Sequence, residues 1–345
     1  MSTGFWINRL FIPGRVCLFG EHSDWAGGYR NENPDLGKGH AIIAPTTQGI
    51  YAESRPTKEK LVLHSCDMQG TTLGSIEIPM ECKCLQKVAE SDHFFSYAAG
   101  VAYELLQHYP VKGMHIHNYK SDLPIKKGLS SSAALCVLVT RAFNAHYGLG
   151  LSLEEEMQIA YKGERNTGSS CGRMDQACAF EKPVYMTFDG DLCQTVPLSP
   201  PTTIYMVLVD LKASKNTRRI LSDLQKGYPF AQNQQQRNVQ SFLGPLNEKI
   251  TQSAVQAIQK GALKELGELM NLAQELFDLH LEPACPSELS APKLHSVLRN
   301  PLLKPHILGG KGVGSQGDGS AQFLVKDEQT QADVMDIIEN QLGLS

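Results

Sequence analysis

The chain has 345 residues, of which 41% are hydrophobic and 20% are charged, a composition typical of a globular protein long enough for two domains. Its net charge of −4 without a concentrated basic segment argues against nucleic acid as the main partner, and no apolar run approaches the ~20 residues of a membrane span. The N-terminus lacks the features of a secretory leader and the nine cysteines are scattered, so we expect a cytoplasmic protein with reduced thiols and no membrane partner.

The N-terminal part of the chain mixes strand and helix patterns without an internal repeat. Alternation of apolar and polar residues predicts strands at 11–19, 40–54, 61–79, 113–119 and 183–196. Helical periodicity predicts helices at 92–108, 130–146 and 152–168. The Gly- and Asn-rich segment 20–39 is expected to be a loop. Cys82-Lys-Cys84 is also expected in a surface loop, because no second Cys/His pair lies nearby to complete a zinc site.

The C-terminal part opens with a buried strand at 202–210, directly after the Pro-rich stretch 197–201. Helices are predicted at 217–226, 231–243, 248–281 with a break near Gly261, and 287–299. The end of the chain is expected to form a strand at 304–309, a Gly-rich loop at 309–319, a strand at 320–326 and a helix at 328–342. Because strands and helices mix without a steady βαβ rhythm, we predict an α+β fold with domains at 1–197 and 198–345.

Three polar side chains follow the first predicted strand within four residues: Glu21, His22 and Asp24. These groups accept hydrogen bonds, and one carboxylate can bind two hydroxyls, which suits a polyhydroxyl ligand such as a sugar. A polar turn closed by Gly27 and Gly28 explains the same residue types. On residue types alone, the turn is the simpler explanation.

A glycine and three consecutive serines precede the helix predicted at 130–146, within the run 124–134. The first turn of a helix offers backbone N–H groups and a positive dipole end. Glycine lets a phosphate approach the backbone, and serine hydroxyls add donors or a metal ligand. The run therefore predicts a triphosphate cradle, although it does not match the Walker A pattern, and a serine-capped helix start is an equal alternative.

Two carboxylates mark a third motif at 163–176, with Glu164 near a helix end and Asp175 after a glycine-containing loop. Mg²⁺ prefers one or two carboxylates, hydroxyls and phosphate oxygens, so Glu164 and a serine of the preceding motif could bind it. Asp175 could orient or deprotonate an attacking hydroxyl. The alternative is that Asp175 caps a following helix.

A fourth segment, 309–319, contains Gly312-Val-Gly-Ser-Gln-Gly317, which matches the dinucleotide pattern G-x-G-x-x-G. Too few residues follow it for the βαβ unit and the acidic residue that such a site needs. We therefore expect a glycine-rich loop that lies against another site.

The order of these motifs resembles the GHMP kinases, the family of galactokinases, homoserine kinases, mevalonate kinases and phosphomevalonate kinases. The serine loop is similar to the family motif Pro-x3-Gly-Leu-x-Ser-Ser-Ala. The galactokinase branch is the most similar, because Pro13-Gly-Arg-Val16 and Gly20-Glu-His-x-Asp24 resemble its signature. Residues 93–101 and Cys171-Gly-Arg-Met-Asp-Gln176 are similar to two further galactokinase segments.

Three departures from galactokinases stand out in the sequence. First, Trp25 takes the place of the usual Tyr. Second, residues 31–39 lengthen the loop after the sugar motif, and residues 212–217 lack the Tyr that galactokinases place on the sugar near there. Third, the loop at 309–319 departs from the usual Gly-x-Gly-x-Gly-Gly. The first two departures put galactose itself in doubt.

The resemblance implies a two-domain GHMP kinase fold with the active site in the cleft between the domains, and it assigns roles by position. The implied catalytic pair is Arg15 and Asp175. The implied sugar-binding residues are Glu21, His22, Asp24 and Gly172. The implied phosphate-binding residues are Lys127, Gly128, Leu129, Ser130, Ser131, Ser132 and Ala133. The implied Mg²⁺ ligands are Ser132 and Glu164.

The activity implied by the resemblance is transfer of the ATP γ-phosphoryl group to a hydroxyl, with the anomeric hydroxyl as first choice, of a monosaccharide or sugar acid. ATP and Mg²⁺ are the implied cofactors, and a small-molecule sugar is the implied partner. A kinase of the same family acting on a cyclitol, homoserine or mevalonate would not need the Glu-His-x-Asp cluster. A sugar sensor without catalysis should have lost Asp175, Arg15 or the serine loop, all of which are present.

Overall fold

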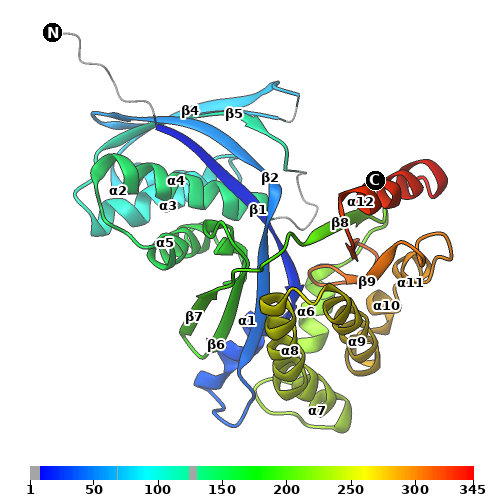
Figure 1. Ribbon diagram of the computed structural model, residues 1–345. Helices are drawn as coiled ribbons and strands as arrows, with labels where there is room; N and C mark the ends of the chain where they lie inside the picture. The colour runs from blue at the N-terminus through cyan, green and yellow to red at the C-terminus, as the bar shows by residue number, and fades with distance from the viewer. Residues whose placement is uncertain (1–7, 68, 124–129) are drawn as a thin grey trace. The chain divides into compact units, whose positions relative to one another are not determined.

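The computed structural model describes residues 8–67, 69–123 and 130–345, and it has the α+β architecture expected from the sequence (Figure 1). The described residues form two compact units, one within residues 1–15 and 45–181 and the other within residues 16–44 and 182–345. Strands β1 (Asn8–Phe19) and β2 (Gly39–Thr57) run from one unit into the other. This division differs from the boundary expected at residue 197. The strands at 184–197 pair with each other and with residues 39–43 of β2, which belong to the second unit.

The first unit is a sheet covered by helices on one face. Its strands follow the order β4-β3-β5-β2, in which β3 and β5 are parallel and the other neighbours antiparallel. The further elements of this unit are β3 (Lys60–Cys66), β4 (Thr72–Pro79), α2 (Cys82–Ala89), α3 (Ser96–His108), β5 (Gly113–Ser121), α4 (Ser131–Tyr147), α5 (Leu153–Arg165) and η2 (Asp175–Ala179). Figure 1 shows α2 to α5 together on one side of the sheet. On β5, Met114 and Ile116 are buried.

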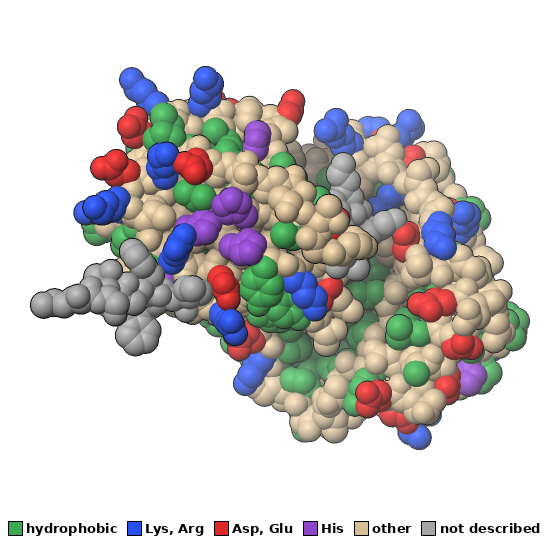
Figure 2. Space-filling model, turned by 90° about the horizontal axis from the view of Figure 1, so that it is seen from above, with side chains coloured by type: hydrophobic (Ala, Val, Ile, Leu, Met, Phe, Trp, Pro, Cys, Tyr) green, Lys and Arg blue, Asp and Glu red, His purple; other side chains and the backbone are tan. Residues whose placement is uncertain are grey.

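The other face of this sheet carries polar and aromatic side chains. Figure 2 shows histidines gathered on one face of the molecule. On β3 and β5, the ring of His64 lies 5.2 Å from that of His115 and 6.1 Å from that of His117, measured between centroids. Tyr119, two residues further along β5, is 39% exposed. Successive side chains of β5 therefore point to opposite faces of the sheet. One face is hydrophobic and packs against the helices, and the other is open to water.

Two glycines allow α3 and α5 to pack closely in the first unit. A Cβ atom on Gly100 of α3 would lie 2.2 Å from the carbonyl oxygen of Gly163 of α5. A Cβ atom on Gly163 would lie 2.6 Å from the Cα atom of Val101. Since Gly163 directly precedes Glu164, this close contact fixes the part of α5 that carries the predicted metal ligand.

We expect Gly100→Ala to destabilise the protein by about 1–3 kcal/mol, although alanine favours helices, because the added methyl group overlaps the backbone of α5. Chemical denaturation followed by circular dichroism measures the change. Gly28→Ala is the matched control, because a Cβ atom at this helical glycine of α1 (Ser23–Gly28) meets no atom within 4 Å. The control should be at least as stable as the unmodified protein. Unchanged stability of Gly100→Ala would contradict the close contact.

The second unit contains two groups of paired strands and most of the helices of the C-terminal part. Strands β8 (Tyr205–Asp210), β10 (Ser320–Val325) and β9 (Ile307–Gly312) form an antiparallel sheet in that order. The first part of β2 pairs with β6 (Val184–Asp189), which pairs with β7 (Leu192–Pro197). The remaining elements are α1, η1 (Tyr29–Asn31), α6 (Thr217–Gln225), α7 (Gln234–Ser241), η3 (Phe242–Leu246), α8 (Asn247–Lys260), α9 (Leu263–Leu281), η4 (Glu282–Ala284), α10 (Pro286–Leu289), α11 (Pro292–Leu298), α12 (Glu328–Asp336) and η5 (Ile337–Gln341). No helix within the described ranges is long and apolar enough to cross a membrane.

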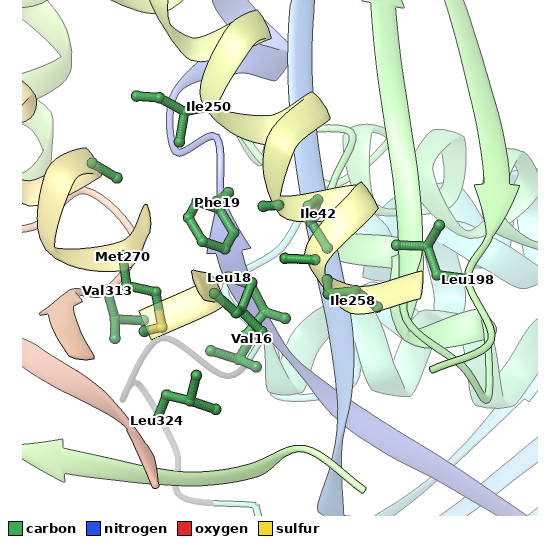
Figure 3. Close-up of a cluster of buried hydrophobic side chains, with 14 residues drawn as sticks. Val16, Leu18, Phe19, Ile42, Leu198, Ile250, Ile258, Met270, Val313 and Leu324 are labelled. Atoms are coloured by element: carbon green, nitrogen blue, oxygen red, sulfur yellow. The ribbon is translucent and has the colours of Figure 1, made fainter. Parts of the chain in front are cut away.

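A hydrophobic core joins the end of β1 to the helices of the second unit. Figure 3 shows Leu18 and Phe19 of β1 close to Ile258 of α8 and Met270 of α9. Phe19 is completely buried, and burying such a side chain contributes roughly 1.5–3 kcal/mol. The core therefore anchors the end of β1, which leads directly into the predicted sugar-binding segment.

Most expected elements are present, and the differences have local reasons. Cys82-Lys-Cys84 is not a surface loop, because it forms the first turn of α2, whose Leu85 is buried. The helix expected at 287–299 is divided at Ala291, which has a left-handed φ of 39° and precedes a proline. The break expected near Gly261 is confirmed, since this residue ends α8 with a φ of 67°.

Candidate active site

Arg15 and Asp175, the predicted catalytic pair, meet within the first unit. The guanidinium Nη2 of Arg15 donates a hydrogen bond to Oδ1 of Asp175, and the two form an ion pair. The Arg15 side chain is 10% exposed and that of Asp175 is 22% exposed, so the pair is partly shielded from water. Asp175 begins η2, but Met174 occupies the cap position and no side-chain capping bond is present. Helix capping therefore does not explain Asp175.

The predicted serine loop leads into α4, but its first serine does not cap the helix. Ser130 occupies the cap position with a left-handed φ of 54°, and its side chain makes no capping hydrogen bond. Its hydroxyl instead donates to Oδ1 of Asp175 at 3.0 Å. The predicted phosphate-binding residues that lie outside the described part of the chain are Lys127, Gly128 and Leu129.

Four further predicted residues belong to the first unit as well. Ser131 and Ser132 are half-buried in the first turn of α4, and Ala133 is completely buried beside them. The carbonyl oxygen of Gly172 accepts a hydrogen bond from the backbone N–H of Asp175 at 3.4 Å. Gly172 therefore lies next to the predicted catalytic pair, whereas the other predicted sugar-binding residues belong to the second unit.

Glu164, the predicted metal ligand, is a buried carboxylate near the end of α5, with 3% of its surface exposed. Its Oε2 atom accepts a hydrogen bond from Nε2 of Gln176 at 2.7 Å, and the Ser132 side chain also hydrogen-bonds to it. Burial, and then the neighbouring Asp175, raise the pKa of Glu164 from 4.5 to about 7. The hydrogen bonds from Ser132 and Gln176 lower this pKa, but they only partly offset the effect of burial.

The side chains of Ser132 and Glu164 fit a magnesium ion. Both supply hard oxygen atoms, and Mg²⁺ sites usually combine one or two carboxylates with substrate phosphates. A cation beside Glu164 would stabilise the ionised form that burial disfavours. In the described ranges, no group of three His, Cys, Asp or Glu side chains is placed to hold a metal by itself. The phosphate oxygens of a nucleotide would therefore have to complete the ligand set.

Glu21, His22 and Asp24 come together in the second unit, at the turn between β1 and α1. Gly20 makes this turn with a φ of 90°, and a Cβ atom there would lie 2.0 Å from the carbonyl oxygen of His40. Only glycine fits this position. The three polar residues are each 5–6% exposed, and Asp24 lies in the first turn of α1. The three residues are therefore buried together at this turn, and their role at a sugar site stays a prediction.

Lys311 is a member of this cluster that the sequence did not reveal. Its side chain is 1% exposed, and its Nζ atom pairs with Oε1 of Glu21 and donates to the carbonyl oxygen of Gly312 at 3.1 Å. The segment expected to be a loop from residue 309 begins as part of β9, and this strand carries Lys311 to Glu21. A lone lysine among glycines is the only trace of the contact in the sequence. Glu21 therefore has a built-in cationic partner.

His22 is held as a neutral ring with a defined donor. The indole Nε1–H of Trp25 donates to Nδ1 of His22 at 3.1 Å, so the ring proton of the neutral form lies on Nε2. Burial lowers the pKa of His22 to about 4, with smaller contributions from Lys215 and Lys311, while a backbone contact with Ser315 acts in the opposite direction. Trp25, where galactokinases usually have Tyr, thus sets the tautomer of a predicted sugar-binding residue.

Comparison with known proteins places these motifs in a family. The family model described as GHMP kinases N terminal domain matches residues 96–182, which include Ser132, Glu164 and Asp175. A galactokinase of Lactobacillus helveticus is 24% identical over 360 residues, which cover 93% of this chain and 86% of that protein. The chain is similar to the GHMP kinases, and in particular to their galactokinase-like branch. A galactokinase of Streptococcus suis is 29% identical over 221 residues, but this match spans only 62% of the chain and 51% of that protein.

Solved structures agree with the GHMP kinase fold. A Lactococcus lactis galactokinase complexed with galactose has a TM-score of 0.72 and 21% identity, over 98% of this chain and 92% of that one. The Methanococcus jannaschii mevalonate kinase also has a TM-score of 0.72, with 17% identity over 100% of this chain and 98% of that one. Because the two scores are equal, the backbone does not separate these branches, and the assignment to the galactokinase-like branch depends on the sequence.

Proposed function

We propose that this protein is a GHMP kinase, which transfers the γ-phosphoryl group of ATP to a hydroxyl, with the anomeric hydroxyl as first choice, of a monosaccharide or sugar acid. The observation that carries the proposal is the meeting of Arg15, Asp175 and Ser130 in the first unit. The buried cluster of Glu21, His22 and Asp24 in the second unit and the relationship to galactokinases support a sugar as acceptor.

In the proposed reaction, the bond between the γ-phosphorus and the β,γ-bridging oxygen breaks, and a bond from the sugar oxygen to phosphorus forms. Such transfers leave the protein mainly positioning and charge stabilisation. Asp175 orients the acceptor hydroxyl and accepts its proton, which then passes to solvent. Arg15 keeps the carboxylate in place and stabilises the negative charge that develops on the transferred group. ADP and a sugar phosphate are the products.

Ser132 and Glu164 would hold the magnesium ion in this proposal. When bound, the ion would neutralise part of the negative charge of the phosphates. Ser131 to Ala133 would offer hydroxyl and backbone N–H donors to the phosphates at the start of α4. These assignments rest on the resemblance together with the contact between Ser132 and Glu164.

The acceptor specificity is tested with the unmodified protein and a panel of neutral monosaccharides, uronic acids, cyclitols and mevalonate. ADP release is measured for each compound, and phosphorus NMR of the product identifies the phosphorylated hydroxyl. We expect ADP release that depends on a sugar or sugar acid. Turnover with only a cyclitol or mevalonate would favour a non-sugar kinase, and sugar binding without turnover would favour a sensor.

We expect Asp24→Asn to raise the KM for the sugar by roughly 10- to 100-fold, because a hydrogen bond to a charged group contributes about 1.5–3 kcal/mol. The KM for ATP should stay within about twofold, and steady-state kinetics measures both values. Glu21 needs a different design, because its removal alone would strand Lys311 as a buried charge. Glu21→Ala combined with Lys311→Met removes both charges together. Equal changes in both KM values would contradict a sugar site at this cluster.

A further inference from the structure

Ser130 has a contact that the predicted phosphate cradle does not explain. It precedes the helix α4 with a φ of 54° and a ψ of 51°, a left-handed conformation that residues other than glycine enter only at an energetic cost. Its backbone carbonyl accepts the first helical hydrogen bond, from Ala134 at 3.0 Å, but its hydroxyl does not cap the helix. Such backbone strain is typical of residues whose position serves a function.

The strained conformation is accompanied by a specific hydrogen bond. The hydroxyl of Ser130 donates to Oδ1 of Asp175 at 3.0 Å, and Arg15 donates to the same oxygen. Both side-chain hydrogen bonds found for this carboxylate in the described ranges end on Oδ1. Two donors on one oxygen fix the rotation of the carboxylate and leave Oδ2 as the atom to face a reacting hydroxyl.

We propose that Ser130 is a positioning residue that holds Asp175 in its reactive orientation, and that it is not primarily a phosphate ligand. This inference rests on the proposed function, in which Asp175 acts on the acceptor hydroxyl. Ser130 directly precedes α4, and Ser132 lies in its first turn and contacts Glu164. One turn of the chain therefore sets the position of the carboxylate that acts on the acceptor and of the carboxylate that would hold the metal.

Ser130→Ala tests the role of the hydroxyl. We expect kcat to fall by roughly 10- to 100-fold, the effect of losing one hydrogen bond to a charged group, while the KM for ATP stays within about twofold. Ser152→Ala is the matched control, because Ser152 does cap its helix, accepting a hydrogen bond from the N–H of Glu155 at 3.2 Å. The control should lower the melting temperature and leave kcat unchanged.

Ser130→Gly separates the hydroxyl from the backbone conformation. Glycine adopts the left-handed conformation without strain, so this variant should melt at the same or a higher temperature than the unmodified protein while its kcat falls as in Ser130→Ala. In an Asp175→Ala background, Ser130→Ala should have no further effect on the residual rate, because Ser130 acts through Asp175. This double-variant measurement distinguishes positioning from an independent structural role.

Two results would overturn the inference while leaving the proposed function intact. One is a raised KM for ATP at unchanged kcat in Ser130→Ala, which would make Ser130 a phosphate ligand. The other is an unchanged kcat together with an unchanged KM. Absence of phosphoryl transfer by the unmodified protein with every acceptor tested would instead overturn the proposed function, and this inference with it.

Discussion

Asp175→Asn is expected to abolish phosphoryl transfer while ATP still binds. The amide cannot accept the proton of the acceptor hydroxyl, and loss of a general base typically lowers the rate by about 10²- to 10⁴-fold. Its carbonyl oxygen can still accept the hydrogen bonds that Ser130 and Arg15 make to Oδ1, so the local geometry should persist. Steady-state kinetics measures kcat, and calorimetry measures the affinity for ATP in the absence of an acceptor.

The control for Asp175→Asn must also remove a carboxylate from an arginine. Glu156→Gln does so in the same unit, because Oε2 of Glu156 pairs with Nε of Arg141 at 2.8 Å and the glutamate side chain is 4% exposed. Breaking this ion pair should lower the free energy of unfolding without lowering kcat. Near-normal turnover of Asp175→Asn would refute the catalytic assignment. Equal losses of kcat in both variants would attribute the effect to the missing ion pair.

The sequence predicted the parts of the site that are contiguous in the chain. Glu21, His22 and Asp24 fall in one motif, and their clustering follows from the turn that Gly20 makes. The meeting of Arg15 with Asp175 was available only from the resemblance, because 160 positions separate them and no local pattern connects them. A family motif carries this long-range information, whereas periodicity does not.

The side chains that the sequence missed are those that support the predicted ones. Lys311 pairs with Glu21 across 290 positions, and the resemblance gave no role to its segment. Trp25 could be recognised only as a departure, since its hydrogen bond to His22 depends on the side-chain geometry of α1. Ser130 was placed with the phosphates because the family motif does not show which way each hydroxyl points. These contacts depend on packing, which residue types alone do not specify.

The same contrast holds for the fold. Long periodic segments such as α9 were predicted nearly to the residue, because their hydrophobic faces are buried along the whole length. The division into units was not predicted, because it depends on strand pairing. Residues 184–188 of β6 pair with residues 39–43 of β2, which are far away in the chain. The Pro-rich stretch at 197–201 marks the end of β7 and not the edge of a compact unit.

Glu164→Gln is expected to stabilise the protein in the absence of nucleotide and magnesium, and to remove its activity. Between pH 4.5 and about 7, the carboxyl is protonated in the folded state but ionised in the unfolded state, because its pKa is raised from 4.5 to about 7. The folding stability therefore falls as the pH rises through this window and levels off above it. The difference between 4.5 and about 7 corresponds to about 3 kcal/mol, the upper limit of the gain expected for Glu164→Gln at pH 8.

Measurement of unfolding at two pH values isolates this effect. At pH 4 the carboxyl is protonated in both states, so Glu164→Gln and the unmodified protein should have similar stability, whereas at pH 8 the variant should be more stable. Glu156→Gln, the matched buried carboxylate with an arginine partner, should instead be destabilised at pH 8. Turnover of Glu164→Gln should fall at least about 100-fold, and Mg²⁺ with ATP should no longer raise its melting temperature beyond ATP alone. If Glu164→Gln is less stable at pH 8 and keeps its activity, Glu164 is a structural residue. If the variant is more stable but inactive, the protein keeps a destabilising buried charge at Glu164 for metal binding.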